Sequence, residues 1–228
     1  FDLKAGGSDN LYAEAFSGGV GVAVINLIAP KTLDRSKTEI RLGSREGSNI
    51  NAAGILIDVI NLRAVADHLT TYNSKADSLS LGVVGYGAAK AVNDIKPEVR
   101  VTFGTSIRVE AQDLVVEAAN RSVKNWLSGA YNAASKSGGV ADLPAPSSVT
   151  TIVSTTAVNI GNWADIRVKG SVSDPGRFDI SAYNDALARD RVKLENAGLL
   201  SIAKAESLIT SSGYASVIVG SNALLQSV

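Results

Sequence analysis

The histidine content sets the first limit on the chemistry of this chain. His68 is the only histidine among 228 residues, so a Ser-His-Asp triad could form only around it. No Gly-x-Ser-x-Gly motif, which holds the nucleophile in one large class of hydrolases, accompanies it. A histidine on the surface or at the edge of a coil is the simpler interpretation, and we assign no catalytic residue.

Four carboxylates offer a second route to catalysis. Glycosidases use paired carboxyl groups on either side of the scissile bond. If strands lie side by side, Glu110, Glu117, Asp165 and Asp179 could approach one another across neighbouring strands. A carbohydrate-active enzyme, of the polysaccharide lyase or glycosidase type, is therefore the alternative function. Solvated charges on an outer face are the simpler interpretation, so we expect no enzyme activity.

The sequence contains none of the metal-binding or cofactor-binding motifs considered below. Calcium-binding repeats carry an aspartate in every Gly-Gly-x-Gly-x-Asp turn, and that motif is absent. The glycines of residues 82–87 match neither the dinucleotide-binding nor the phosphate-loop spacing. We therefore expect no metal and no cofactor. The aspartates considered share no common period: Asp34, Asp58, Asp94, Asp142 and Asp174.

Glycines at a regular interval indicate a repeating architecture. Gly43, Gly104, Gly161 and Gly220 each follow a short alternating stretch, as in Ile40-Arg-Leu-Gly43. Their spacing stays close to about 60 residues, and such a period belongs to stacked repeats rather than to one closed core. We interpret these four glycines as structural turn residues between short strands.

Asparagines give a second landmark with a similar period. Asn61, Asn120 and Asn184 each close a stretch that reads as a strand. They too follow one another at intervals of about 60 residues, as expected for repeats. Stacked side-chain amides could donate hydrogen bonds to the backbone of the next coil. We expect a structural role for them; a role in glycan contact is the weaker alternative, and no ligand-binding residue can be named.

Composition narrows the classes of partner. Lysine plus arginine and aspartate plus glutamate both number 22, which gives no charge bias toward nucleic acid. Cysteine and methionine are absent, and no apolar run reaches the roughly 20 residues of a membrane span. Aromatic residues make up only 5% of the chain, which favours a narrow core of small and β-branched side chains. We expect no nucleic-acid partner and no membrane span in this segment.

These patterns predict an all-β fold, a parallel β-helix (β-solenoid) of about four irregular repeats. The repeats span approximately residues 1–54, 55–113, 114–176 and 177–228 of one continuous segment. Known coils commonly take on the order of 20 to 30 residues, so we expect two or three coils in each repeat. Residues 185–209 contain good helix formers, but the equivalent section from Ser78 to Val92 alternates and contains glycine, so strand is favoured for both. A non-repeating α/β domain with helices in these sections is the remaining option.

The repeating phrase resembles a known group of proteins. Gly18-Gly-Val-Gly-Val-Ala-Val-Ile-Asn26, followed later by Val158-Asn-Ile-Gly161 and Ala164-Asp-Ile-Arg-Val168, is similar to repeats of very large bacterial surface proteins, the haemagglutinin-like and filamentous adhesins. The resemblance implies a long parallel β-helix, right-handed, that projects from the cell and contacts hosts, other bacteria or matrix. It supplies no catalytic motif.

We therefore expect a structural or adhesive element of an extracellular bacterial stalk, adhesin or filament. Its expected partners are neighbouring repeats or copies of itself placed end to end, together with host-cell, bacterial or matrix glycans and proteins. The expected location is extracellular or at the cell surface. Phe1 and Val228 both fall within the repeating pattern, so we also expect the segment to be a fragment of a longer chain.

Overall fold

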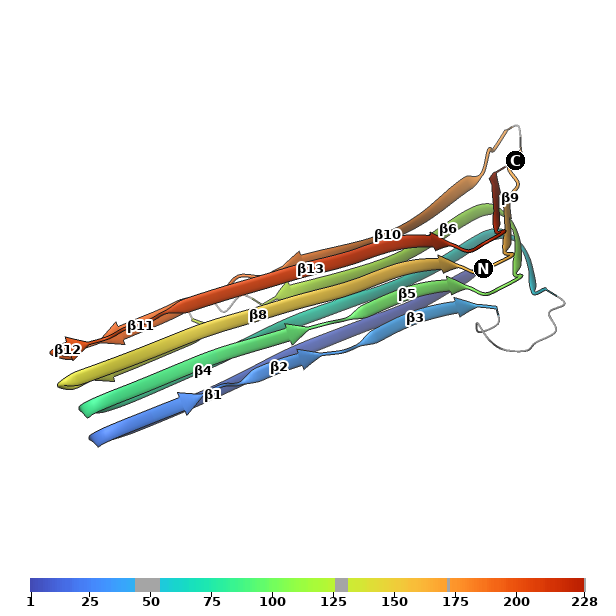
Figure 1. Ribbon diagram of the computed structural model, residues 1–228. Coiled ribbons are helices and arrows are strands. Elements are labelled where there is room, and N and C mark those ends of the chain that lie inside the picture. The colour runs from blue at the N-terminus through green and yellow to red at the C-terminus, as the bar shows by residue number, and fades with distance from the viewer. Residues whose placement is uncertain (44–53, 126–130, 172, 228) are drawn as a thin grey trace.

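The computed structural model describes residues 1–43, 54–125, 131–171 and 173–227, and within these ranges the chain forms strands and no helix. The strands belong to one sheet (Figure 1). Their bounds are β1 (Asp2–Ile28), β2 (Lys31–Asp34), β3 (Lys37–Leu42), β4 (Leu56–Ile95), β5 (Glu98–Phe103), β6 (Arg108–Lys124), β7 (Ala133–Gly138), β8 (Ala141–Ile160), β9 (Asp165–Val168), β10 (Arg177–Leu187), β11 (Val192–Asn196), β12 (Leu200–Ser201), β13 (Glu206–Val219) and β14 (Leu224–Ser227).

All pairings in this sheet are parallel, and partners lie about one repeat apart in the sequence. Asp2 of β1 pairs with Arg63 of β4, and Val84 of β4 pairs with Ala141 of β8. The shortest offset joins Leu56 to Arg108, and the longest joins Asp113 to Arg177. The expected parallel, all-β architecture is thus confirmed, and the sheet is not closed.

The prediction of two or three coils in each repeat was wrong. Two or three coils per repeat would pair residues about 20 to 30 positions apart. Even the shortest observed offset, between Leu56 and Arg108, is far longer than that. Each repeat therefore forms a single coil, which pairs along its length with the next repeat. The physical reason is the length of the strands. β4 alone contains 40 residues, so one coil takes up most of the residues of a repeat.

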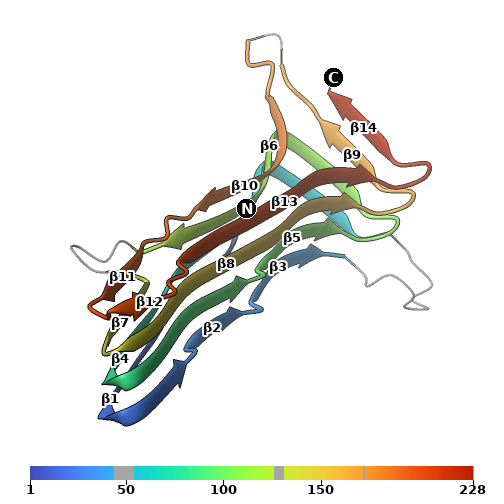
Figure 2. The same cartoon turned by 60° about the vertical axis from the view of Figure 1, so that its left-hand side comes forward.

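Each long pass folds back on itself at a tip. In β4 the even-numbered residues from Leu62 to Ser80 face inward, but from Gly85 to Ile95 the odd-numbered residues do so. Such a change of parity marks the place where the chain turns and a second arm runs back over the first. Ser80 Oγ donates a hydrogen bond to the carbonyl oxygen of Tyr86, 3.0 Å away, which ties the two arms together. Figure 2 shows the arms as two layers that lie one over the other.

The space between the layers is wide at one end and narrow at the other. The wide end, at the corners that follow β3, β5, β8 and β13, holds a large apolar cluster that includes Phe103, Ile107 and Leu114. Toward the tips the core shrinks to a cluster of four alanines, Ala76, Ala89, Ala91 and Ala133. Small residues are required there because the layers approach closely: a Cβ on Gly87 would lie 2.9 Å from Ser135 Oγ of the facing layer.

A buried polar network links successive repeats in the interior. Thr32 donates a hydrogen bond to Asn93, which donates to Thr150, so three successive repeats are linked at one register position. Thr150 in turn contacts an ion pair of Lys124 and Asp190, whose side chains are 1% and 0% exposed. Burial lowers the pKa of Lys124, and the facing carboxylate of Asp190 opposes that shift.

The section for which helix was an option contains strands and no helix in the structure. Residues 185–209 contain the end of β10, all of β11 and β12, and the start of β13. Val192 pairs with Ala133, and Glu206 pairs with Ser147, so the preceding repeat supplies the hydrogen-bonding edge. That tertiary template outweighs the helix propensity of alanine, leucine and lysine in this section.

Candidate functional site

The four periodic glycines gather at one corner of the molecule. A Cβ on Gly43 would lie 3.4 Å from the Cα of Gly104, and a Cβ on Gly161 would lie 2.6 Å from the carbonyl carbon of Gly104. A Cβ on Gly220 would lie 2.7 Å from the carbonyl carbon of Gly161. The backbones at Gly161 and Gly220 therefore stack too closely for a side chain, whereas Gly43 has a φ of 91°, which residues with a side chain rarely adopt.

The residues that follow these glycines complete a tight turn. Ser106, Trp163 and Asn222 each lie two positions after a corner glycine and have φ values of 57°, 60° and 58°. Successive turns are joined by backbone hydrogen bonds, from Ser106 N to Asn162 O (2.9 Å) and from Trp163 N to Ser221 O (3.0 Å). The corner is thus a repeated, hydrogen-bonded structure and not a set of unrelated loops.

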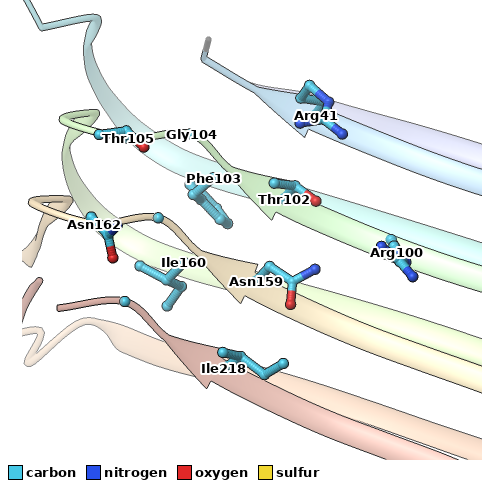
Figure 3. Close-up of a pocket in the computed structure, with 12 residues that line it drawn as sticks. Arg41, Arg100, Thr102, Phe103, Gly104, Thr105, Asn159, Ile160, Asn162 and Ile218 are labelled. Atoms are coloured by element: carbon cyan, nitrogen blue, oxygen red, sulfur yellow. The ribbon is translucent and has the colours of Figure 1, made fainter. Parts of the chain in front are cut away.

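A groove of about 340 Å³ runs across the strands beside this corner (Figure 3). Its floor carries a row of side chains in register, one from each of β3, β5, β8 and β13. The row consists of Arg41, Thr102, Asn159 and Ile218. Because neighbouring parallel strands lie about 4.8 Å apart, this row presents an evenly spaced line of side chains to the outside.

The groove can form hydrogen bonds but has little capacity for acid–base catalysis. Arg41 pairs with Glu39 at 2.5 Å, and Arg100 pairs with Glu98, so both guanidinium groups are held along their own strands. The described residues that line the groove include no carboxylate and no histidine. Guanidinium, amide and hydroxyl groups in this arrangement suit contacts with sugars or peptides rather than bond cleavage.

The carboxylates proposed for glycoside cleavage lie on β6, β9 and β10, where each has a partner. Glu110 pairs with Lys169 and Arg108, and Asp165 accepts a hydrogen bond from Arg167 at 2.8 Å. Lys169 and Arg108 hold the pKa of Glu110 below its ordinary value. A general acid needs a raised pKa, so this shift has the opposite sign.

The other two carboxylates are similarly engaged. Asp179 pairs with Arg177 at 2.6 Å, on the same strand. Glu117 accepts a hydrogen bond from the hydroxyl of Tyr183 at 3.0 Å, and that bond raises the pKa of Tyr183. Tyr183 is 43% exposed, as expected for a residue on an outer face.

The asparagines predicted to stack do so only in part. Asn120 pairs with Asn184 in register, whereas Asn61 is exposed and pairs with Asp113. Equivalence of Asn61 with Asn120 was expected from their interval, but β4 and β6 are offset by a shorter stretch of chain at this point. None of the three asparagines ends a strand, since β4, β6 and β10 continue beyond them.

The inward-facing amides of Asn120 and Asn184 form hydrogen bonds with the facing layer and not with the next repeat. The side-chain nitrogen of Asn120 donates to the carbonyl oxygen of Pro97 at 3.4 Å, and Thr156 donates to Asn184. The position that corresponds to Asn120 in the preceding repeat is His68. The sequence predicted that Asn120 and Asn184 belong to one column, but it placed Asn61 where the structure has His68.

His68 does not form a catalytic triad. Its Nε2 lies 2.9 Å from Ser36 Oγ and 3.3 Å from Asp9 Oδ2, so the hydroxyl and the carboxylate approach the same ring nitrogen. A triad needs them on opposite nitrogens. Here the other nitrogen, Nδ1, faces Thr38 Oγ1 at 3.1 Å.

Sequence reasoning also missed the glycine column at the tips. Gly21 pairs with Gly82, and a Cβ on Gly139 would lie 1.7 Å from the carbonyl oxygen of Gly82. These three glycines follow one another at intervals of about 60 residues, the same period as the corner glycines. That shared period is the signal that would have identified them.

The chain contains two tryptophans. Trp163 is 63% exposed and lies in the corner turn. Trp126 lies outside the described residues. The described residues also contain no helix long and apolar enough to cross a membrane.

Comparison of the chain with protein-family models, with curated proteins and with solved structures found no match. Its function must therefore be argued from the arrangement of its own residues.

Proposed function

We propose that this chain is a segment of a right-handed parallel β-solenoid that serves as a structural and adhesive element of an extracellular bacterial stalk or filament. The observation that carries the proposal is the parallel register, which runs through every repeat with one repeat stacked directly on the next. Stacked repeats form elongated structures whose length grows with repeat number.

The last repeat presents an unfinished core. Val217 and Val219 pair with Val158 and Ile160, which are 0% and 2% exposed, yet they are themselves 44% and 46% exposed. Their inward positions would be buried by one more layer of strands. A further repeat or a second copy, stacked in the same direction, would supply that layer.

Stacking of copies in this way is head-to-tail and does not close, so it leads to filaments. The N-terminal edge offers the complementary surface, because β1 pairs with β4 on one side only. Parallel strands on both surfaces keep the polarity of the sheet along the whole stack.

The outer surface supplies the adhesive part of the proposal. The groove at the corner offers guanidinium, amide and hydroxyl groups, which suit glycan or protein contacts. Its lining and the lowered pKa of Glu110 favour binding over the alternative of a carbohydrate-active enzyme. Incubation with immobilised polysaccharides is expected to retain the protein and release no sugar fragments; release of fragments would support the enzyme.

Sedimentation velocity at increasing concentration, with electron microscopy of the same samples, tests the stacking. We expect association into thin fibres. Val217→Asp places a charge on the open end of the core and should abolish the fibres, whereas Ile218→Asp places it on the outer face and should leave them. Compact separate particles of the unaltered chain at every concentration would contradict end-to-end assembly of copies.

A further inference from the structure

One group of side chains in the first repeat has a composition unlike the rest of the interior. Asp9 of β1, Asp34 at the end of β2 and His68 of β4 direct an imidazole nitrogen and carboxylate oxygens to one point, with these atoms all within 4.8 Å of one another. Asp34 and His68 are only 3% and 2% exposed. Three strands from two successive repeats thus contribute one donor each.

Among the described residues, no lysine or arginine balances the charge of this group. Asp34 accepts hydrogen bonds from Ser36 N (2.8 Å) and from the Thr70 hydroxyl (2.6 Å), but no lysine or arginine of the described chain forms an ion pair with it. Asp9, whose side chain is 38% exposed, has an ion-pair contact with His68 and with no other described residue. Of the two carboxylates, that of Asp34 is buried without a cationic side chain, and burial of such a charge is costly unless hydrogen bonds or a bound metal ion compensate it.

The histidine is held in the orientation that a metal ligand requires. Thr38 Oγ1 lies 3.1 Å from Nδ1, so a hydrogen bond there leaves Nε2 directed at the carboxylates. Nε2 has Ser36 Oγ at 2.9 Å, Thr70 Oγ1 at 3.1 Å and Asp9 Oδ2 at 3.3 Å, and a single ring proton cannot serve all three. When the ring proton lies on Nδ1, the lone pair of Nε2 faces the Asp9 carboxylate, and a cation between them removes that repulsion.

Backbone geometry also makes room for this arrangement. Gly7 pairs with His68 in register, and a Cβ at Gly7 would lie 2.3 Å from Nδ1. An open groove between β1 and β3, lined by Asp9, Ser36 and His68, connects the group with solvent. An ion therefore has a path of entry and space for water ligands.

We propose that Asp9, Asp34 and His68 bind a first-row divalent transition-metal ion such as Zn²⁺. One imidazole and two carboxylates suit such an ion, whereas Ca²⁺ and Mg²⁺ prefer oxygen ligands alone. Bond lengths of about 2.0–2.2 Å require the ligand atoms to move closer than they now lie. The ion would join β1, β2 and β4, and so fasten the first repeat to the second.

The test is titration of the tag-free chain with Zn²⁺ in a calorimeter and with Co²⁺ by visible absorption. His68→Asn is the main variant, because asparagine already occupies the corresponding positions of the next two repeats and should preserve the fold. Asp34→Asn removes one charge with little change of shape. Asp179→Asn, at an exposed ion pair on β10, is the matched control.

We expect one ion per chain, a rise in thermal unfolding temperature with Zn²⁺, and at least about tenfold weaker binding in H68N and D34N but not in D179N. Circular dichroism confirms that the variants fold. The proposal is overturned if the unaltered chain binds neither ion, or if H68N and D34N bind as tightly as it does. It is also overturned if stability at this site follows pH alone and ignores Zn²⁺, since His68 is then simply the cationic partner of the aspartates.

Discussion

At the scale of single residues, the corner glycines are set by backbone contact. Gly161 lies against the backbone of Gly104, and an added Cβ would come within 2.6 Å of its carbonyl carbon and 2.7 Å of its carbonyl oxygen. Such a contact can be relieved only by displacement of one repeat relative to the next. The corner therefore fixes the spacing between repeats.

Gly161→Ala should lower the free energy of unfolding by about 1–3 kcal/mol, because neither backbone can yield without loss of hydrogen bonds. Gly6→Ala is the matched control, since a Cβ there would meet nothing within 4 Å. It should change stability by no more than about 0.5 kcal/mol. Urea unfolding curves measure both, and equal effects of the two changes would contradict the stacked corner.

Glu110 is held by two cationic side chains on the outer face. Glu110 pairs with Arg108 two positions earlier on β6 and with Lys169 after β9. Hydrogen bonds from Lys169 and Arg108 keep the pKa of Glu110 below its ordinary value of 4.5. The stability that this carboxylate contributes is present above pH 4.5 and is lost as the pH falls through its lower pKa in the folded protein.

Glu110→Gln should therefore reduce stability near neutral pH and have less effect as the solution is acidified. Urea unfolding midpoints of the variant and the unaltered chain, measured from about pH 7 to about pH 3, check the sign. Lys169→Met should remove part of the same pH dependence while leaving Glu110 in place. A difference between Glu110→Gln and the unaltered chain that grows toward acid pH would contradict this assignment.

At the scale of elements, the layers converge from a wide apolar end to a narrow end of alanine, serine and glycine. Ala89 and Ala91 are 0% exposed and lie in the alanine cluster between the layers. Their neighbour Ala88 has the opposite parity and is only partly buried. Side-chain volume along the strand thus sets the separation of the layers.

Ala89→Leu should lower the free energy of unfolding by about 1–3 kcal/mol, because the narrow end has no space for the larger side chain. Ala88→Leu adds the same atoms to the outer side and should stay within about 0.5 kcal/mol of the unaltered chain. Thermal or urea unfolding distinguishes the two. A larger loss for Ala88→Leu would mean that the parity of this arm is reversed.

At the scale of the whole molecule, the sequence predicted the parallel architecture because glycine at a fixed interval has a direct backbone meaning. It did not predict the length of a coil, since the turn at the tip is encoded by a change of parity in the middle of β4 and not by a break in the strand. The prediction that Asn61 is equivalent to Asn120 was wrong, because the number of residues between paired positions differs from one pair of strands to the next. The group around His68 could not be found from spacing, since Asp9 and Asp34 lie on different strands and pair in register with Thr70 and Ile95, not with further aspartates.

Throughout the described part of the molecule, each repeat pairs in parallel with the next. The corner, the groove, the open ends and the group around His68 all depend on this pairing, because each is built from residues of neighbouring repeats. The register can be tested without interference from native thiols, because the chain has no cysteine.

The most direct test is disulfide formation in dilute solution between cysteines placed in the outward row of the groove. Thr102→Cys with Asn159→Cys joins neighbouring strands, where the Cα separation of about 4.8 Å suits a disulfide. Thr102→Cys with Ile218→Cys spans the intervening β8, which holds the two residues too far apart. The account predicts rapid intramolecular crosslinking of the first pair and none of the second. A crosslink in the second pair, or its absence in the first, would contradict the stacked parallel register.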